Sequence, residues 1–332
     1  MTHRFVSSVR HSSNAGNNLS ISSGVREALA ALLRLVRGKG PAAKIGVALG
    51  GGFARGIAHA GVLEVLERHR IPIHCVTGTS AGAIVAAAYA SGVKPSEIAR
   101  VGCSMRFQDV ARWSLGRMGF VASERMQGFL EKLLRVYRFE EMRIPLGVVA
   151  TDLASGRPVD FCGPGDVFLP IRASCSYPGL FRPVRQEGRL LVDGAIGMEV
   201  PAALARRLGA THVISVYLPM LESDVFPRNM FQVVNRCFQI LQSRTEKDWR
   251  AASDLVIAPD VREMAWDGFD RGMEMVKAGE VAATVALARL PGSLLAENRE
   301  PSGGMPATGR PPRPSPVPIH APSAQPPAEP SR

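Results

Sequence analysis

The chain has 332 residues, of which 46% are hydrophobic and 21% charged, so it can bury a full core and is neither fibrous nor wholly disordered. Its net charge of +11 would attract a polyanion, but charge alone does not distinguish a nucleic acid from an anionic membrane as the binding partner. Five cysteines, an odd number without a C-x-x-C pair, argue against a disulfide framework or a zinc site and favour a reducing compartment.

The N-terminal segment carries much of the positive charge. Residues 1–44 hold seven basic residues and one acidic residue, so this segment has a net charge of +6 out of the total of +11. The first 23 residues show no apolar period, whereas residues 24–37 repeat apolar side chains at helical spacing. We therefore expect residues 1–43 to be a basic disordered arm with a short amphipathic helix, either simply solvated or attracted to an anionic membrane surface. No apolar run is long enough to span a membrane, and no cleavable signal peptide is expected.

A glycine-rich turn, Gly50 to Gly56, follows the first predicted strand, Ile45 to Leu49. Bare backbone amides in such a turn can bind an anion, either a nucleotide pyrophosphate or the oxyanion of an acyl-transfer intermediate. The dinucleotide pattern fits poorly because Arg55 stands at its third glycine position. The phosphate-loop pattern fails because Ile57 and Ala58 occupy the places of its Lys and Ser/Thr.

The second predicted strand, Ile73 to Thr77, leads into Gly78-Thr79-Ser80-Ala81-Gly82, which has the G-x-S-x-G spacing. A helix of small residues, Ala81 to Ser91, follows directly. A sharp turn from strand to helix presents its central residue to a substrate. The flanking glycines have no side chain, so the neighbouring backbone segments can pass close to one another without a clash. Ser80 is therefore a candidate nucleophile. The alternative interpretation is an ordinary turn in which Ser80 caps the helix.

Further strands and helices alternate along the chain and predict an α/β fold with a mainly parallel sheet. The expected strands are 146–151, 159–162, 189–192, 212–218 and 254–258, and the expected helices are 57–69, 123–137, 166–174, 201–208, 229–253 and 271–290. After residue 290 the composition changes, since residues 291–332 contain 12 of the 25 prolines. We expect a folded domain over residues 44–290 and a disordered proline-rich tail over residues 291–332.

A nucleophilic serine needs a base, and the seven histidines offer no good candidate. Only His59 lies near the glycine-rich turn, where a partly buried helical histidine is the simpler interpretation. A carboxylate is the remaining option. Asp193, before a glycine at the end of a short apolar strand, is the best candidate, although Asp-Gly is also a common turn pair. Asp152 is a positional rival.

Together these motifs resemble the bacterial branch of the patatin-like phospholipase family. The resemblance rests on the glycine-rich turn with Arg55, the G-x-S-x-G motif at Ser80 and the Asp-Gly-Ala element at Asp193. It extends to the sequence between these motifs, as in Pro178-Gly-Leu-Phe-Arg-Pro183. It covers residues 44–220 closely and continues loosely to about residue 290. Ser174-Cys175-Ser176-Tyr177 and Gly197-Met198-Glu199 depart from the family pattern.

The resemblance implies a three-layer fold and a Ser80–Asp193 dyad without a histidine. It further implies an oxyanion hole from the amides of Gly51, Gly52 and Phe53, with Arg55 ordering that loop or meeting a phosphate. The implied activity is hydrolysis of phospholipids, lysophospholipids or related lipid esters, with no metal or cofactor. We expect a cytoplasmic protein, peripheral at a membrane if the basic arm binds there.

Other functions remain open at the level of sequence. The same dyad could transfer the acyl group to an acceptor other than water, which would make the protein a lipid acyltransferase. A non-catalytic membrane-associated binding protein is the further alternative. Nucleic-acid binding rests on charge alone, because no helix-turn-helix or aromatic stacking surface is recognisable. The sequence does not define the oligomeric state.

Overall fold

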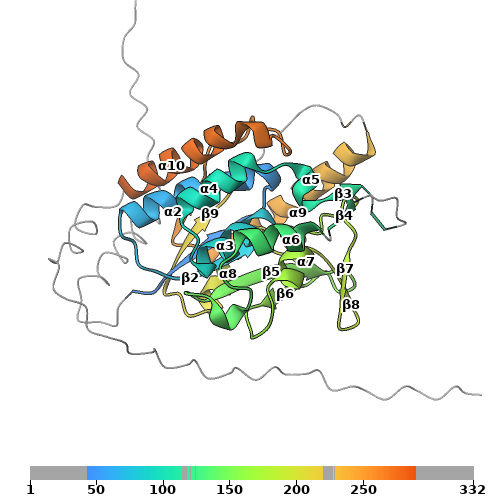
Figure 1. The fold of residues 1–332 in the computed structure, drawn as a ribbon, viewed down its shortest axis with the longest axis horizontal. Coiled ribbons are helices and arrows are strands. Elements are labelled where there is room, and N and C mark those ends of the chain that lie inside the picture. Colours follow the sequence, from blue (N-terminus) through green and yellow to red (C-terminus); the bar gives the residue numbers. More distant parts are fainter. Residues whose placement is uncertain are drawn as a thin grey trace, which may run out of the picture. The chain divides into compact units, whose positions relative to one another are not determined.

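An eight-stranded sheet forms the centre of the computed structural model (Figure 1), which describes residues 43–113, 118–119, 121–123, 125–219, 227 and 229–288. The strand order is β10-β9-β1-β2-β5-β8-β7, and β6 also pairs with β5. The bounds are β1 (Ile45–Leu49), β2 (Ile73–Thr79), β5 (Leu146–Asp152), β6 (Pro158–Phe161), β7 (Val184–Gln186), β8 (Arg189–Asp193), β9 (His212–Val216) and β10 (Leu255–Ile257). A separate pair consists of β3 (Arg112–Trp113) and β4 (Val121–Ala122).

The strands from β10 to β5 are parallel, whereas β6, β7 and β8 join the sheet antiparallel. Helices cover both faces (Figure 1). The helices are α2 (Ala58–Arg68), α3 (Ala81–Ser91), α4 (Pro95–Ser104), α5 (Phe107–Val110), α6 (Arg125–Leu133), α7 (Phe168–Ser174), α8 (Ala202–Arg207), α9 (Met230–Ala251) and α10 (Gly272–Ala288). This arrangement confirms the expected α/β fold with helices flanking a mainly parallel sheet.

Alternate residues of β1 reach opposite faces of the sheet, as strand geometry requires. Val47 and Leu49 pack in the core cluster that contains residues of α2 and α3. Ala48 between them packs in a second cluster with residues of α8 and with Trp249 of α9. A strand buried on both faces carries a continuous apolar run rather than an alternating one, which explains the sequence of β1.

One edge of β5 brings the ends of two other strands together. Along this edge β2 runs parallel to β5, and its last residue, Thr79, pairs with Val149. From the next residue on, the edge is taken by the antiparallel β8, whose last residue, Asp193, pairs with Ala150. Strand β6 occupies the opposite edge, because it pairs with residues that also pair with β2 or β8. Strands β2 and β8 therefore run toward one another along this edge, and their C-terminal ends meet at Val149 and Ala150.

Most expected elements are present, with several differences. The helix expected over residues 123–137 is shorter, since α6 ends at Leu133. Helices α4 and α5 and the short strands β3, β4 and β7 were not expected from the sequence. The basic arm, its amphipathic helix and the proline-rich tail lie outside the described residues.

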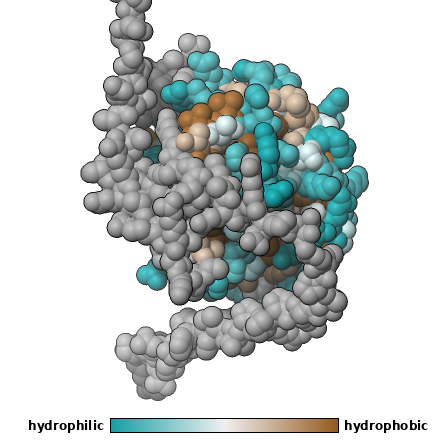
Figure 2. All heavy atoms as spheres, turned by 90° about the vertical axis from the view of Figure 1, so that its left-hand side faces the viewer, coloured by the Kyte–Doolittle hydropathy of each residue, from teal (hydrophilic) through white to brown (hydrophobic). Residues whose placement is uncertain are grey.

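Exposed large apolar side chains occur on two long helices, α9 and α10, and at a few isolated positions. On the face of the molecule in Figure 2, hydrophilic residues predominate among the coloured atoms, and apolar residues gather in patches between them. Within the described ranges, no helix is both long enough and apolar enough to cross a membrane.

Candidate active site

Ser80 lies at a sharp turn between β2 and α3. Its backbone angles, φ 54° and ψ −124°, are uncommon for a residue with a side chain and cost about 1–3 kcal/mol of strain. The turn also needs its glycines, since a Cβ on Gly82 would lie 2.2 Å from the carbonyl oxygen of Leu49. The amide of Ser80 donates a 2.8 Å hydrogen bond to Oγ of Ser174 on α7, which holds the turn in place.

The hydroxyl of Ser80 meets the carboxylate of Asp193. Ser80 Oγ donates a 2.8 Å hydrogen bond to Asp193 Oδ2, and the amide of Ala195 donates a 2.9 Å bond to Oδ1. Both side chains are almost fully buried. Burial raises the pKa of Asp193 to about 7, although the bonds from Ala195 and Ser80 oppose that rise. A carboxylate with a pKa near neutral pH is suited to accept a proton from a hydroxyl.

The other candidates for a base are placed elsewhere. His59 is fully buried on α2, and its Nε2 lies 2.9 Å from the carbonyl oxygen of Gly50, behind the glycine-rich turn. Desolvation lowers the pKa of His59 to about 4, so this ring is neutral. The carboxylate of Asp152 accepts hydrogen bonds from Ser155 Oγ and the amide of Ala154, so it stabilises a turn after β5. Within the described part of the chain, neither residue forms a hydrogen bond with Ser80.

The glycine-rich turn runs beside Ser80. A Cβ built on Gly51 would lie 3.5 Å from the Cβ of Ser80. The amide of Gly51 donates a 3.3 Å hydrogen bond to the carbonyl of Glu199, and the amides of Ala54 and Arg55 are also bonded to carbonyls. Within the part of the chain that the structure describes, the amides of Gly52 and Phe53 donate no hydrogen bond. These two amides are free to receive a negatively charged oxygen.

Arg55 lies beneath this turn and is 6% exposed. Its Nε donates to the carbonyl of Gly52 at 3.4 Å, a long bond that ties the side chain to the turn. Burial lowers the pKa of Arg55, and the carboxylate of Glu199 partly offsets this effect. The guanidinium therefore supports the loop from within.

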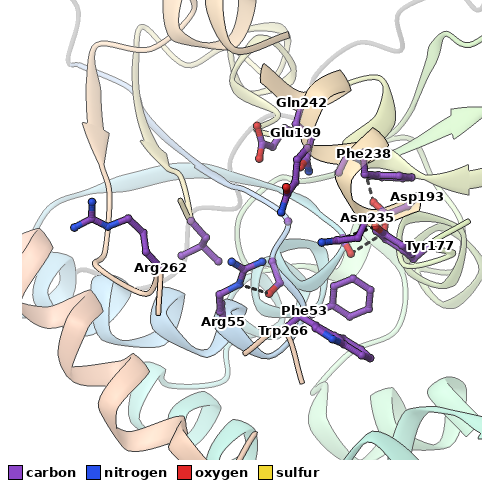
Figure 3. Close-up of a pocket in the computed structure, with 16 residues that line it drawn as sticks. Phe53, Arg55, Tyr177, Asp193, Glu199, Asn235, Phe238, Gln242, Arg262 and Trp266 are labelled. Carbon is purple, nitrogen blue, oxygen red and sulfur yellow. Dashed lines mark hydrogen bonds between the residues drawn. The ribbon is translucent and has the colours of Figure 1, made fainter. Parts of the chain in front are cut away.

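A cavity of about 190 Å³ opens at Ser80 and Asp193 (Figure 3). Phe53 contacts Tyr177 and Trp266 edge to face, with ring centroids 5.0 Å and 5.1 Å apart, and these rings form part of its wall. The remaining lining residues are Gly51, Gly52, Arg55, Ala195, Glu199, Leu218, Asn235, Phe238, Gln239, Gln242 and Arg262. Such a mixed apolar and polar lining is typical of a small-molecule site.

Several of these residues were not identified from the sequence. Tyr177 and Glu199 belong to the two segments that depart from the family pattern, and that departure was the signal available for them. Burial raises the pKa of Glu199 to about 7, with Glu246 adding to the effect. Phe238 and Gln242 come from α9, and nothing in their spacing distinguishes them from ordinary residues of an amphipathic helix.

Comparison with known proteins places this site in a family. Residues 47–206 match the model of the patatin-like phospholipase family. An uncharacterized NTE family protein of Mycobacterium tuberculosis is 34% identical over 179 residues, which are 53% of this chain and 49% of that protein. The lysophospholipase NTE1 of Mycosarcoma maydis is 28% identical over 226 residues, 66% of this chain and 12% of that protein. This chain thus spans about half the length of the mycobacterial relative and a smaller part of the fungal one.

A solved structure shares the fold. VipD from Legionella pneumophila superposes with a TM-score of 0.51 at 14% sequence identity, over 75% of this chain and 67% of that one. At this identity the likeness concerns the fold alone. The match to the patatin-like phospholipase family covers residues 47–206, the part of the chain whose motifs indicated that family.

Proposed function

We propose that this protein hydrolyses acyl esters of phospholipids, lysophospholipids or related lipids, with Ser80 as nucleophile and Asp193 as base. The observation that carries the proposal is the 2.8 Å hydrogen bond between these two buried side chains at a strained turn. The family match and the name of the fungal relative, a lysophospholipase, support the same class of substrate.

In the first half of the reaction, Ser80 Oγ attacks the carbonyl carbon of the ester while Asp193 Oδ2 takes the hydroxyl proton. The carbonyl oxygen becomes negatively charged, and the amides of Gly52 and Phe53 donate to it. Gly51 would join them only by releasing the carbonyl of Glu199. When the tetrahedral intermediate collapses, the ester C–O bond breaks and Asp193 returns the proton to the departing alcohol.

In the second half, water attacks the acyl group on Ser80. Asp193 accepts a proton from this water, and the fatty acid leaves as the proton returns to Ser80 Oγ. The dipole of α3, whose N-terminus begins at Ser80, favours the negative charge in both halves. Arg55 has a positioning role, because its bond to Gly52 keeps the neighbouring amides directed at the reacting oxygen.

A fluorophosphonate probe with gel detection tests the nucleophile. We expect the wild-type protein to be labelled and the Ser80→Ala variant not to be. Ser104→Ala, at an exposed serine on α4, is the matched control and should label like the wild type. Labelling that persists in Ser80→Ala, together with unchanged hydrolysis of a short acyl ester, would contradict the proposal.

A further inference from the structure

Helix α9 has two contrasting faces. One face covers the reaction cavity, to which it contributes Asn235, Phe238, Gln239 and Gln242. The opposite face is exposed and carries large apolar side chains, with Val233 47% and Ile240 46% exposed at positions seven residues apart. At seven residues, or nearly two turns, these side chains lie on the same side of the helix.

Basic side chains share this exposed face. Arg236, Arg244 and Lys247 are exposed and lie at helical positions next to Val233 and Ile240. Residues 230–245 contain no acidic residue. Glu246 and Asp248 flank Lys247, and the exposed Asp248 lies one turn beyond Arg244. A helix surface that mixes exposed aliphatic and cationic side chains is typical of segments lying in the interface of an anionic membrane.

An apolar groove lies between the start of this helix and Trp266. It has a volume of about 660 Å³, and its lining includes Met230 of α9, Leu180 and Trp266. Trp266 also lines the reaction cavity, and Met230 is 68% exposed. Arg106, Asp267 and Asp270 line the groove too, so its charged side chains are of both signs and do not select a phosphate headgroup. The other lining residues are apolar side chains and one glycine, so the groove suits an acyl chain.

We propose that the exposed face of α9 docks on an anionic lipid surface. Val233 and Ile240 enter the interface, while Arg244 and Lys247 contact lipid phosphates. This places the open end of the apolar groove at the membrane, from which an acyl chain can reach Trp266 and the reaction cavity. The route of the acyl chain rests on the proposed lipid hydrolysis, whereas the docking itself does not.

A nucleic acid could also attract the basic side chains of α9. Exposed Val233 and Ile240 favour lipid, because burying aliphatic side chains in a membrane is favourable and a phosphate backbone offers them nothing comparable. Docking through α9 also differs from attraction of the N-terminal arm, since it is specific to a helix that covers the active site.

Vesicle cosedimentation of the full chain tests the docking. The Ser80→Ala protein is the parent, so that no lipid is consumed, and the vesicles contain phosphatidylcholine with or without phosphatidylglycerol. We expect binding to the anionic vesicles that falls about 25-fold in Arg244→Gln/Lys247→Gln, from about fivefold per basic residue. Val233→Asp/Ile240→Asp should also release the protein. Thermal unfolding of each variant shows whether its fold is intact.

The matched control is Val281→Asp/Val285→Asp, which changes two similarly exposed valines on α10. It should bind vesicles like the parent. The docking is overturned if the parent does not bind anionic vesicles, if the α10 control loses as much binding as the α9 variants, or if the α9 variants lose affinity for duplex DNA while still binding vesicles. A separate assay with a short soluble ester reports on hydrolysis, so failure of the proposed function is distinguishable from failure of docking.

Discussion

Ser80 and Asp193 are separated by 113 residues in the chain, yet Oγ of the first donates a 2.8 Å hydrogen bond to the second. Neighbouring residues of β5 bring them together, because Val149 pairs with Thr79 and Ala150 with Asp193. A slip of β8 by one residue would turn the Asp193 side chain to the other face of the sheet. The pairing register of β5 therefore sets the geometry of the Ser80–Asp193 pair.

Replacing Asp193 tests its role as base. The side-chain amide introduced by Asp193→Asn cannot accept a proton from Ser80, so we expect kcat/KM for a short acyl ester to fall by about 10²- to 10⁴-fold. Asp152→Asn is the control, since this carboxylate stabilises a turn and is not at the site. Equal losses in both variants would count against a specific role for Asp193.

The activity should depend on pH near neutrality. As the proposed base, the carboxyl of Asp193 must be ionised to accept a proton. Its pKa is raised to about 7, so kcat/KM should rise with pH through about 7 and then level off. Glu199, whose pKa is also about 7, lines the same cavity. The profile of Glu199→Gln separates the two groups. If that variant loses the inflection near pH 7, the titrating group is Glu199 instead.

The same raised pKa should affect stability. The pKa of Asp193 is near 3.8 in the unfolded chain, so the folded protein binds this proton more tightly than the unfolded chain does. This tighter proton binding adds to the free energy of unfolding. Its contribution is fully present below about pH 4 and is lost as pH rises through about 7. Relative to wild type, Asp193→Asn should therefore gain stability over this range, by at most about 4 kcal/mol. Denaturant unfolding at several pH values measures the difference, and a difference that does not change with pH would contradict it.

Two glycines near Ser80 should respond differently to alanine. A Cβ at Gly82 would meet the Leu49 and Gly50 carbonyl oxygens at 2.2 Å and 2.6 Å, so Gly82→Ala should fold poorly or not at all. A Cβ at Gly51 meets its nearest atoms at 3.5 Å, an ordinary contact. Gly51→Ala should keep its melting temperature and lose activity, because the new methyl group stands beside Ser80 where substrate must approach. Full activity in Gly51→Ala would show that substrate does not pass this glycine.

Ser174 should contribute to stability through the turn. Its hydroxyl accepts the hydrogen bond of the Ser80 amide in a buried environment. Ser174→Ala leaves that amide without this acceptor, so we expect a loss of about 1–3 kcal/mol in the free energy of unfolding. Ser104→Ala, at the surface, should change it by less than about 0.5 kcal/mol. Similar losses in both variants would argue against the role of Ser174.

The parts of the fold predicted from sequence are those with local signals. The strand–turn–helix context of Ser80 and the glycine-rich turn are contiguous in the chain, so propensity and spacing were enough to locate them. Strand β7 has three residues, too few for a period to show, and it forms because of its neighbours. Helix α4 is amphipathic and begins with Pro95, so the chain did carry a signal for it that the sequence analysis did not use.

The walls of the site were less predictable than its centre. Phe238 and Gln242 line the cavity because α9 crosses it, and only tertiary packing determines which face of that helix points inward. The free amides of Gly52 and Phe53 also depend on packing, since Gly51 is bonded to Glu199 from a distant segment. Sequence spacing indicated the loop as a whole but not which of its amides stay free.

The meeting of β2 and β8 along β5 also bears on how activity appears during folding. Ser80 and Asp193 are brought together only when β5, which is distant from both in the chain, pairs with β2 and β8. Contacts between segments so far apart form slowly, because closing long loops costs entropy before any contact compensates for it. In a refolding experiment we therefore expect helical signal to return first and labelling of Ser80 to return last, together with completion of the sheet.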